Sequence, residues 1–290
     1  MSNIDLIIEE RPRDVGNFMV GRLLPFRTKR MVGPFIFIDH MGPAHNLNMD
    51  VAPHPHIGLS TLTYLFEGNI VHKDSIGTEI EIKPGQVNWM TAGSGVVHSE
   101  RTPQYLRNAE KSFHGLQIWV ALPKEHEQTE PSFFHANENE LPVWTDNDIE
   151  YKLVAGTFAG KKSPVPVYSP LYFLELKSNE RQLVKIGEEL YGESGLYILE
   201  GSIESEGTQF GPKELLVAKN SKLCEFTMNE NTTVCFFGGE PLPEQRLIYW
   251  NFVASEQSYI DRAKTKWLEQ KFPPVKGETE FVPLPPERHI

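Results

Sequence analysis

Cysteine is scarce in this chain, whose 290 residues include only Cys224 and Cys235. Both lie in apolar, strand-like runs, which indicates buried free thiols rather than a disulfide scaffold. Basic residues are also outnumbered, with 28 Lys and Arg against 39 Asp and Glu. The resulting net charge of −11 gives the chain no basic footprint for direct nucleic-acid binding.

Long apolar runs are missing as well. The longest falls far short of the roughly 18 residues that a membrane-spanning helix needs. The first residues, MSNIDLIIEERPRD, are charged and too poor in apolar side chains for a signal peptide. These absences predict a soluble cytoplasmic protein without membrane contact, and a nuclear location is also compatible if the source is eukaryotic.

Short strand-like runs occur in place of long apolar ones. They are rich in β-branched and aromatic residues and are bounded by Gly, Pro, Asn or Ser, which is typical of an all-β sandwich or barrel. The runs read GPFIFID, STLTYLF, TEIEIKPG, GLQIWVALP, SPLYFLELK, GLYILEG and KLCEFTM.

One helix is predicted, in residues 254–272 near the C-terminal end. Its apolar residues recur at helical spacing and are Tyr259, Ile260, Ala263 and Trp267. Ser255 is the expected N-cap, and Pro273 and Pro274 are expected to end the helix. We expect this helix to pack against a barrel.

An internal repeat divides the chain. YLFEGNI at residues 64–70 matches YILEGSI at residues 197–203 in Tyr, Glu, Gly and Ile. A repeat at this distance indicates two similar domains rather than a solenoid. Because the segment between them is polar and loop-like, we expect one domain at residues 1–138 and a second at residues 139–290.

The segment VAPHPHIG places His54 and His56 on either side of Pro55. In an extended strand, residues two apart point to the same face, so the two imidazoles should lie side by side. The positions that correspond to them in the second half are Gly187 and Glu189. The scaffold therefore does not need the histidines, which favours a metal-binding role over a structural one.

A second pair with the same spacing is His98 and Glu100, in GVVHSE. Two strands of one barrel, each presenting such a pair inward, can enclose one ion with three imidazoles and a carboxylate. The absence of cysteine from this set argues against a structural zinc site. Such ligands with open positions suit redox-active Fe(II), and Mn, Ni, Cu and Zn are chemically compatible alternatives.

Six other histidines are not assigned as ligands. Four are expected to lie in the core or beside the ligands, and two are expected to be solvated. In chain order the first four are His40, His45, His72 and His114, and the other two are His126 and His135.

The chain resembles the pirin family of bicupins. The motifs that carry the resemblance are FIFIDHMGP, HPHIGLSTLTYLFEG, HKDSIG, PGQVNWMTAGSGVVHSE and GLQIWVALP, within residues 18–135. SPLYFLEL, GLYILEG and GGEPLPE fit the family's C-terminal barrel less closely. Beyond them, LIYWNFVASE retains only Asn251 and Phe252 of the stretch that many pirins share.

The resemblance implies a bicupin of two stacked, jelly-roll-like β-barrels with a C-terminal α-helix. It places a metal, typically Fe(II), in the N-terminal barrel. The family's H-x-H and H-x-E ligands correspond to His54, His56, His98 and Glu100.

Two functions are compatible with this reading. The first is a quercetin 2,3-dioxygenase-like oxidoreductase that uses O₂ to cleave a small aromatic flavonol, with Glu100 both a metal ligand and the catalytic base. The alternative is a metal-dependent redox sensor that regulates transcription or a metabolic enzyme through a protein partner. Open metal positions in a barrel favour the enzyme.

Overall fold

The computed structural model describes residues 3–286 except residue 17, residues 187–189 and residues 219–224. β-Strands dominate these residues, as predicted, and every strand-like run identified in the sequence contains a strand in its described part. The short 3₁₀ helices are η1 (Gln104–Leu106), η2 (Lys124–His126) and η3 (Glu138–Glu140). No helix among the described residues has the length and apolar character needed to cross a membrane.

The chain forms two compact units, each built from separated segments. The first contains residues 1–12, 21–40 and 136–242, and the second contains residues 13–20, 41–135 and 243–290. The expected change of domain at residue 138 lies close to the passage from the second unit into the first. The chain ends are grouped differently from the expected ranges, because each end packs with the other half of the sequence.

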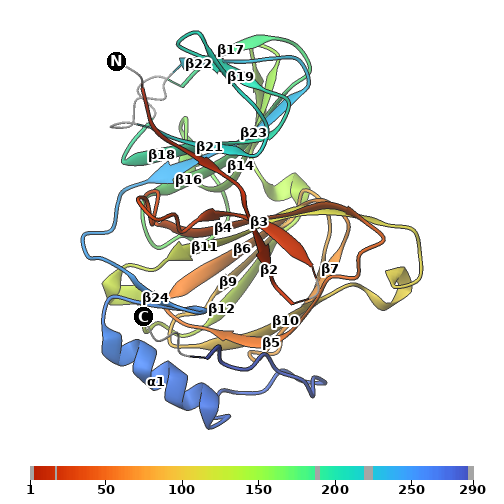
Figure 1. Ribbon diagram of the computed structural model, residues 1–290, viewed down its shortest axis with the longest axis vertical. Coiled ribbons are helices and arrows are strands. Elements are labelled where there is room, and N and C mark those ends of the chain that lie inside the picture. The colour runs from red at the N-terminus through yellow and green to blue at the C-terminus, as the bar shows by residue number, and fades with distance from the viewer. Residues whose placement is uncertain (1–2, 17, 187–189, 219–224, 287–290) are drawn as a thin grey trace. The chain divides into compact units, whose positions relative to one another are not determined.

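The first unit contains a large sheet (Figure 1). Its strands are, in spatial order, β1 (Ile4–Glu9), β21 (Glu214–Ala218), β18 (Glu193–Glu200), β23 (Thr232–Gly239), β16 (Leu171–Ser178), β14 (Ile149–Phe158) and β13 (Val143–Asp146), with β15 (Lys161–Lys162) paired to β14. A four-stranded sheet accompanies it, in the order β17 (Gln182–Lys185), β22 (Glu225–Met228), β19 (Ile203–Ser205) and β20 (Thr208–Phe210). Apolar side chains from both sheets form one buried cluster, which is the expected core of a β-sandwich or barrel.

A second long sheet has seven strands, and a second four-stranded sheet lies within the second unit. The strands of the seven-stranded sheet are, in order, β12 (Ser132–Ala136), β9 (Val87–Thr91), β6 (Leu59–Glu67), β11 (Ser112–Ala121), β4 (Phe35–His45), β3 (Met19–Leu24) and β2 (Arg11–Asp14). The four-stranded sheet has the order β5 (Asp50–His56), β10 (Val96–Arg101), β7 (Ile70–Asp74) and β8 (Glu79–Ile82). A hairpin of β24 (Leu247–Tyr249) and β25 (Phe252–Ala254) completes the unit.

The repeated heptapeptide has the same place in both units. Gly68 lies between β6 and β7, and Gly201 lies between β18 and β19, so each turn leads from a long sheet into a four-stranded one. Both glycines adopt left-handed backbone conformations, with φ of 82° and 72°. A β-carbon would lie 2.6 Å from the Ser112 carbonyl oxygen at Gly68. Glycine therefore satisfies both the conformation and the close approach.

The helix α1 (Gln257–Leu268) lies within the predicted segment and buries Ile260, Ala263 and Trp267, as expected. The predicted N-cap is wrong. Glu256 occupies that position, while the Ser255 hydroxyl donates a hydrogen bond to Glu127 instead, at 2.8 Å.

The buried face of α1 packs in one cluster with Ile57 and Val97. Ile57 directly follows β5, and Val97 lies on β10 between Val96 and His98. The helix therefore supports the two strands that carry the predicted ligands, whereas the sequence-based division had placed it with the C-terminal domain.

The N-terminal end, like the helix near the C-terminal end, packs with a distant part of the sequence, which makes the compact units discontinuous. Strand β1 forms an antiparallel ladder with β21, more than two hundred positions later in the numbering, with Ile7 opposite Leu216.

Of the two cysteines, Cys235 is buried and free, as predicted, and Cys224 lies outside the described residues. The positions Gly187 and Glu189, which correspond to the paired histidines, also lie outside them.

Candidate metal centre

The predicted ligand pairs lie on adjacent antiparallel strands. His98 on β10 is directly opposite His54 on β5, and Val96 is opposite His56. Because strand residues alternate between faces, His54, His56 and His98 share one face, while Pro55 and Val97 share the other. The H-x-H spacing therefore places two imidazoles on one face of β5, as predicted, and the pairing of β5 with β10 adds the third imidazole.

The three imidazoles form a compact, buried group. Their ring centroids are 5.0 Å apart for His54 and His56, 4.3 Å for His54 and His98, and 5.0 Å for His56 and His98. One ring nitrogen from each lies within 4.8 Å of the other two. This spacing is compatible with one ion bound by all three side chains.

Hydrogen bonds determine which nitrogen of each ring is free to bind. The His54 Nδ1–H donates to the Ala52 carbonyl oxygen at 2.9 Å, which leaves the Nε2 lone pair available. His56 bonds to the backbone of Asn251, while its Nδ1 is buried and has no hydrogen-bond partner. The Nε2 of His98 is likewise buried without a partner. Buried polar atoms without partners are rare in folded proteins, and a metal ion would satisfy these two.

Glu100 lies in a second group, together with His98 and His72, whose candidate ligand atoms are within 4.8 Å of one another. The Thr63 hydroxyl is 3.2 Å from Glu100 Oε1 and 3.1 Å from Gln117 Oε1. Since His98 belongs to both groups, the four predicted residues form one continuous cluster. His72 is the member that the sequence interpretation did not assign.

His72 links His98 to a buried carboxylate. Its Nε2–H donates to Asp74 Oδ2 at 3.1 Å, so in a neutral imidazole its Nδ1 is an acceptor. The Nδ1 atoms of His72 and His98 are 3.3 Å apart. His98 Nδ1–H must then be the donor, which leaves the lone pair on His98 Nε2, the atom without a partner. Metal-binding histidines commonly have such a carboxylate behind them.

Burial favours the form of the histidines that binds metal. Desolvation lowers the pKa of His54 to about 4, and it also lowers the pKa of His56 and His98 well below the ordinary value. The neighbouring imidazoles add to the effect, because each disfavours a positive charge on the others. All three are therefore neutral near pH 7 and present lone pairs rather than protons.

The carboxylates of the cluster differ in their environment. Burial raises the pKa of Glu100, partly offset by His72 and by the Thr63 hydrogen bond. Burial also acts on Asp74, but hydrogen bonds from His72 and Thr78 outweigh it and lower its pKa. Asp74 thus remains a charged acceptor, whereas Glu100 is the better proton acceptor near neutral pH.

One side chain differs from its expected environment, and a second one beside the histidines was not anticipated. His135 was expected to be solvated, but it is half-buried and lies 2.8 Å from Asn88 Oδ1. The indole of Trp119 packs edge-on against His56, with ring centroids 5.1 Å apart.

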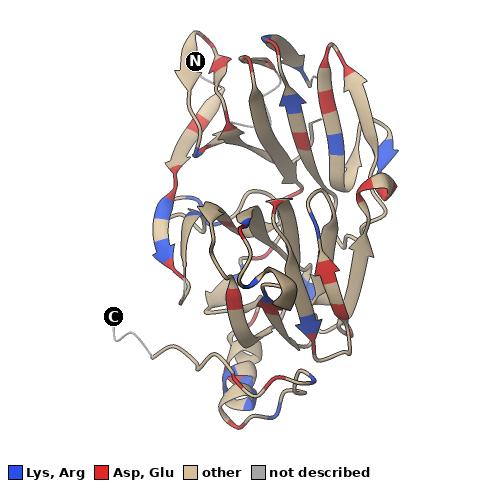
Figure 2. Cartoon of the chain, turned by 90° about the vertical axis from the view of Figure 1, so that its right-hand side faces the viewer, with Lys and Arg blue, Asp and Glu red and all other residues tan. Residues whose placement is uncertain are grey.

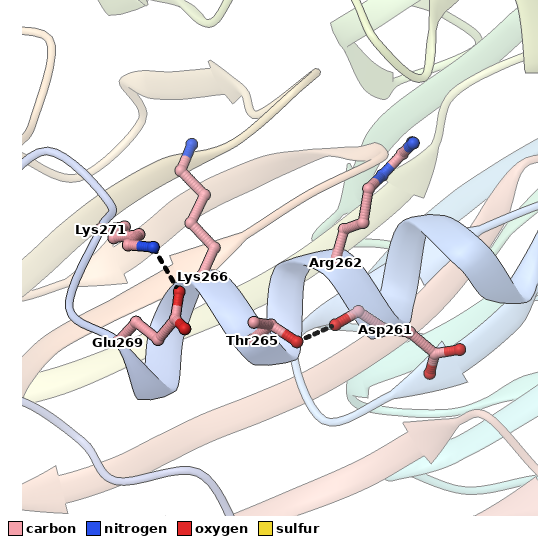
Figure 3. Close-up of a pocket in the computed structure, with 6 residues that line it drawn as sticks. All are labelled: Asp261, Arg262, Thr265, Lys266, Glu269 and Lys271. Carbon is pink, nitrogen blue, oxygen red and sulfur yellow. Dashed lines mark hydrogen bonds and ion pairs between the residues drawn. The ribbon is translucent and has the colours of Figure 1, made fainter.

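A hollow on α1 is lined by charged and polar side chains rather than by histidines. It has a volume of about 370 Å³ and is lined by Asp261, Arg262, Thr265, Lys266, Glu269 and Lys271 (Figure 3). Lys271 is 2.7 Å from Glu269, and the Thr265 hydroxyl donates to the Asp261 carbonyl oxygen. None of its lining residues belongs to the histidine cluster, so this hollow is separate from the candidate site.

The fold and the buried histidine cluster on its β-sheet define the class of a cupin with two such domains. Comparison with known proteins gives the family. The Pirin family model matches residues 17–120, and the model of the Pirin C-terminal cupin domain matches residues 173–273. A pirin-like protein of Caulobacter vibrioides is 45% identical over 289 residues, covering 97% of this chain and 99% of that protein. The chain belongs to the pirin family.

Solved structures support the same class. A structure of quercetin 2,3-dioxygenase from Acinetobacter baumannii is 31% identical, with a TM-score of 0.88, and covers 98% of this chain and 97% of its own. The bacterial pirin YhhW of Escherichia coli, solved in complex with nickel(II), is 18% identical with a TM-score of 0.64. That likeness covers 82% of this chain and 99% of the YhhW chain, and it shows the shared fold. The bicupin prediction is confirmed.

Proposed function

We propose that this chain is a metal-dependent dioxygenase that cleaves a flavonol such as quercetin with O₂. The observation that carries the proposal is the set of three buried, neutral imidazoles, each with a ring nitrogen within 4.8 Å of the others, beside a buried carboxylate. The likeness to quercetin 2,3-dioxygenase of Acinetobacter baumannii over 98% of the chain supports the choice of substrate class.

His54, His56 and His98 would hold the metal, with Glu100 as a fourth ligand. Fe(II) is the proposed ion, and Mn, Ni, Cu and Zn are compatible with the same donors. When bound, a redox-active ion would acidify a coordinated flavonol hydroxyl and make O₂ chemistry accessible. His54 and His56 are held by bonds to Ala52 and Asn251, which fix the orientation of both rings.

Glu100 is the proposed base for the flavonol 3-hydroxyl proton. A general base is most effective when its pKa is near the operating pH, and burial raises the pKa of Glu100 in that direction. The Thr63 hydroxyl, within reach of Glu100 Oε1, would orient the carboxylate. Thr63 also contacts Gln117, so strands β6, β10 and β11 together determine where the proton acceptor lies.

The proposal is tested with protein purified without oxygen, stripped of metal and reloaded separately with each of the five candidate ions. We expect one metal per chain, and we expect quercetin loss and carbon monoxide release under O₂ with at least the Fe(II) form. Two equivalents of tightly bound metal would contradict the assignment to a single site. Metal binding without turnover would instead favour the redox-sensing alternative.

That alternative would act through a protein partner rather than through DNA. In the view of Figure 2, bands of Lys and Arg alternate with bands of Asp and Glu along the strands and do not form a continuous basic stripe. Direct electrostatic contact with nucleic acid is therefore disfavoured.

Asp74→Asn is expected to weaken metal binding by about 10–100-fold, as removal of such supporting contacts typically does. The backbone amides of Ile76 and Thr78 both donate to Asp74 Oδ1, at 3.1 and 2.8 Å. They would keep the asparagine oxygen on that side, so its NH₂ would face His72 Nε2. His72 would then carry its proton on Nδ1 and donate to His98, which would move the His98 proton onto Nε2.

The affinity of Asp74→Asn for Ni(II) and Zn(II) is measured by competition with a chromophoric chelator. Glu79→Gln is the matched control, because Glu79 lies on the adjacent strand β8 in an exposed ion pair with Lys73. The control should bind as the wild type does. Unchanged affinity in folded Asp74→Asn would show that the Asp74–His72 pair does not set the state of His98.

A further inference from the structure

The last described residues cross the strands that carry the candidate ligands. We call residues 276–286 the C-terminal strap. The Val282 amide donates to the Pro53 carbonyl oxygen at 2.9 Å, and the Val282 carbonyl accepts from Trp267 Nε1 at 3.1 Å. The Tyr249 hydroxyl donates to the Pro285 carbonyl oxygen at 3.2 Å. The strap is thus fixed both to β5 and to the segment that includes α1.

Its attachment point on β5 is a β-bulge. His98 is opposite His54, but Glu100 is opposite Val51, so Ala52 and Pro53 together face the single residue Ser99. A bulge bends a strand and redirects its side chains, and bulges are common beside functional sites. This one lies between the pairings of His98 and Glu100, where it determines how the two ligand pairs face each other.

Both carbonyl groups of the bulge have defined partners. The Ala52 carbonyl accepts from the His54 imidazole, and the Pro53 carbonyl accepts from Val282 of the strap. One bulge residue therefore orients a candidate ligand, and the next is bound by the strap. Any shift of the strap at Val282 acts on the residue directly before His54.

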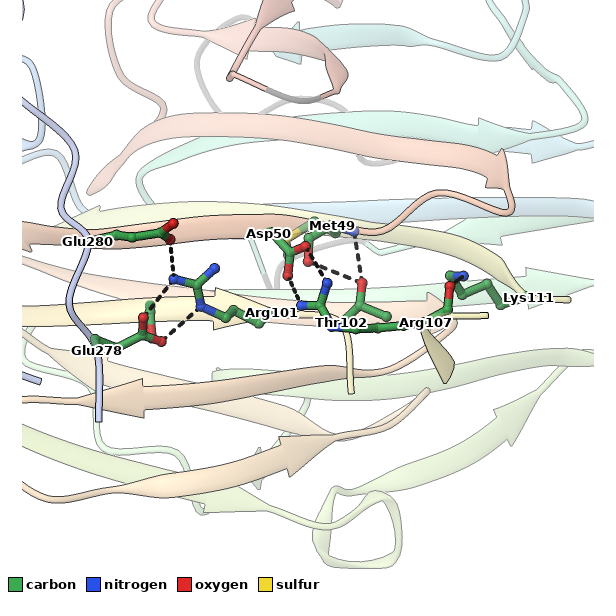
Figure 4. Close-up of polar contacts among 9 residues, drawn as sticks. Met49, Asp50, Arg101, Thr102, Arg107, Lys111, Glu278 and Glu280 are labelled. Carbon is green, nitrogen blue, oxygen red and sulfur yellow. Dashed lines mark hydrogen bonds and ion pairs between the residues drawn. The ribbon is translucent and has the colours of Figure 1, made fainter. Parts of the chain in front are cut away.

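The strap also holds the opposite strand, through residues that alternate with the candidate ligands. The buried Ser99 hydroxyl donates to Glu278 Oε1 at 2.9 Å. Arg101 donates to both oxygens of Glu278, at 2.8 and 2.6 Å, and to Glu280 at 2.9 Å (Figure 4). Bidentate pairs of arginine and carboxylate are geometrically specific as well as strong.

The two glutamates of the strap differ in environment. The side chain of Glu278 is 10% exposed, whereas that of Glu280 is 68% exposed. The Arg101 hydrogen bond lowers the pKa of Glu278, so this carboxylate is charged across the neutral range. Glu278 is therefore the anchor, and Glu280 is a solvated neighbour that contacts the same arginine.

We propose that the C-terminal strap is a positioning element for the metal site, with Glu278 as its principal residue. Glu278 acts through Ser99 and Arg101, which flank Glu100, and Val282 acts through Pro53, which precedes His54. Neither contacts a candidate ligand side chain directly. The inference rests on the proposed metal site but not on flavonol cleavage.

The test compares Glu278→Ala, Glu278→Gln and Glu280→Ala in the full chain. Affinity for Ni(II) and Co(II) is measured by chelator competition, and the visible Co(II) spectrum reports the ligand geometry. Thermal melting of the metal-free proteins measures stability separately. We expect Glu278→Ala to lose roughly tenfold in affinity and to change the Co(II) spectrum. Glu278→Gln, which still accepts hydrogen bonds, should lose less, and Glu280→Ala should match the wild type.

Several results of these measurements would contradict the proposal. If folded Glu278→Ala keeps wild-type affinity and spectrum, the strap does not position the site, even if the melting temperature falls. Equal losses in Glu278→Ala and Glu280→Ala would point to strap charge rather than to the Glu278 contacts. Glu278→Ala could fail to fold, in which case the other two variants decide. The proposal is then overturned if Glu278→Gln and Glu280→Ala both have the metal affinity and the Co(II) spectrum of the wild type. A wild type that binds no metal overturns the site and the strap together, whereas failure of quercetin turnover alone leaves the affinity comparison decisive.

Discussion

Glu100→Gln, loaded with Fe(II) to wild-type occupancy, is expected to turn over quercetin about 10²–10⁴-fold more slowly, the usual loss for a missing general base. The amide can still offer an oxygen to a metal, but it cannot take up the hydroxyl proton. Glutamine also keeps the length of the side chain and an acceptor for the Thr63 hydroxyl, which contacts Glu100 Oε1 in the wild type. The loss should therefore fall on the reaction rate more than on metal binding.

Metal content is determined first, and quercetin loss is then followed under O₂ at equal occupancy. Glu110→Gln serves as the control, since Glu110 is exposed and lies outside both candidate ligand groups. Near wild-type turnover by Glu100→Gln would exclude Glu100 as the base. A comparable loss in the control would show that the effect is not specific to the site.

Arg246→Met is expected to lower the free energy of unfolding by about 3–5 kcal/mol, the usual effect of leaving one partner of a buried ion pair uncompensated. The side chains of Arg246 and Glu127 are both 0% exposed, and Arg246 Nε lies 3.0 Å from Glu127 Oε1. Arg246 also donates to the Leu122 carbonyl oxygen through Nη2 at 2.9 Å. Burial already raises the pKa of Glu127, so loss of the positive charge leaves this carboxyl in an unfavourable environment.

Urea denaturation of the metal-free protein, followed by tryptophan fluorescence, measures this effect. The matched control is Lys124→Met, because Lys124 and Glu256 form an ion pair with side chains 50% and 49% exposed. Exposed pairs contribute at most about 1 kcal/mol, so the control should unfold near the wild-type urea concentration. A change below about 1 kcal/mol in Arg246→Met would mean that the two Ser255 hydrogen bonds to Glu127 are sufficient on their own.

Period-two spacing explains why much of the candidate site could be predicted. His54 and His56 must share a strand face, and so must His98 and Glu100, whichever strands pair. The sequence does not encode in any local pattern that β7 pairs with β10. That pairing places Glu100 opposite His72 and His98 opposite Asp74. The H-x-D spacing of His72 and Asp74 repeats the pattern of the other two pairs and is the signal that could have identified them.

The wrong N-cap of α1 and the unexpected grouping of the chain ends both come from contacts between residues far apart in the sequence. Ser255 has the chemistry of an N-cap, but buried Glu127 takes both its amide and its hydroxyl hydrogen, and the helix begins later, at Gln257. Likewise, the local pattern predicts α1 as an element but not the surface against which it packs. The β1 ladder with β21 and the packing of α1 against Ile57 are contacts between distant parts of the sequence. Such contacts depend on which buried surfaces remain to be covered.

The bond from Val282 to Pro53 also sets an order of events during synthesis. A ribosome completes β5 and β10 long before it reaches Glu278 and Val282, so a nascent chain holds both ligand-bearing strands while the strap does not yet exist. Closing a loop of this length is entropically costly and comes late in folding. The bulge therefore acquires its full set of hydrogen bonds only once residues 276–286 have been synthesised and have reached β5.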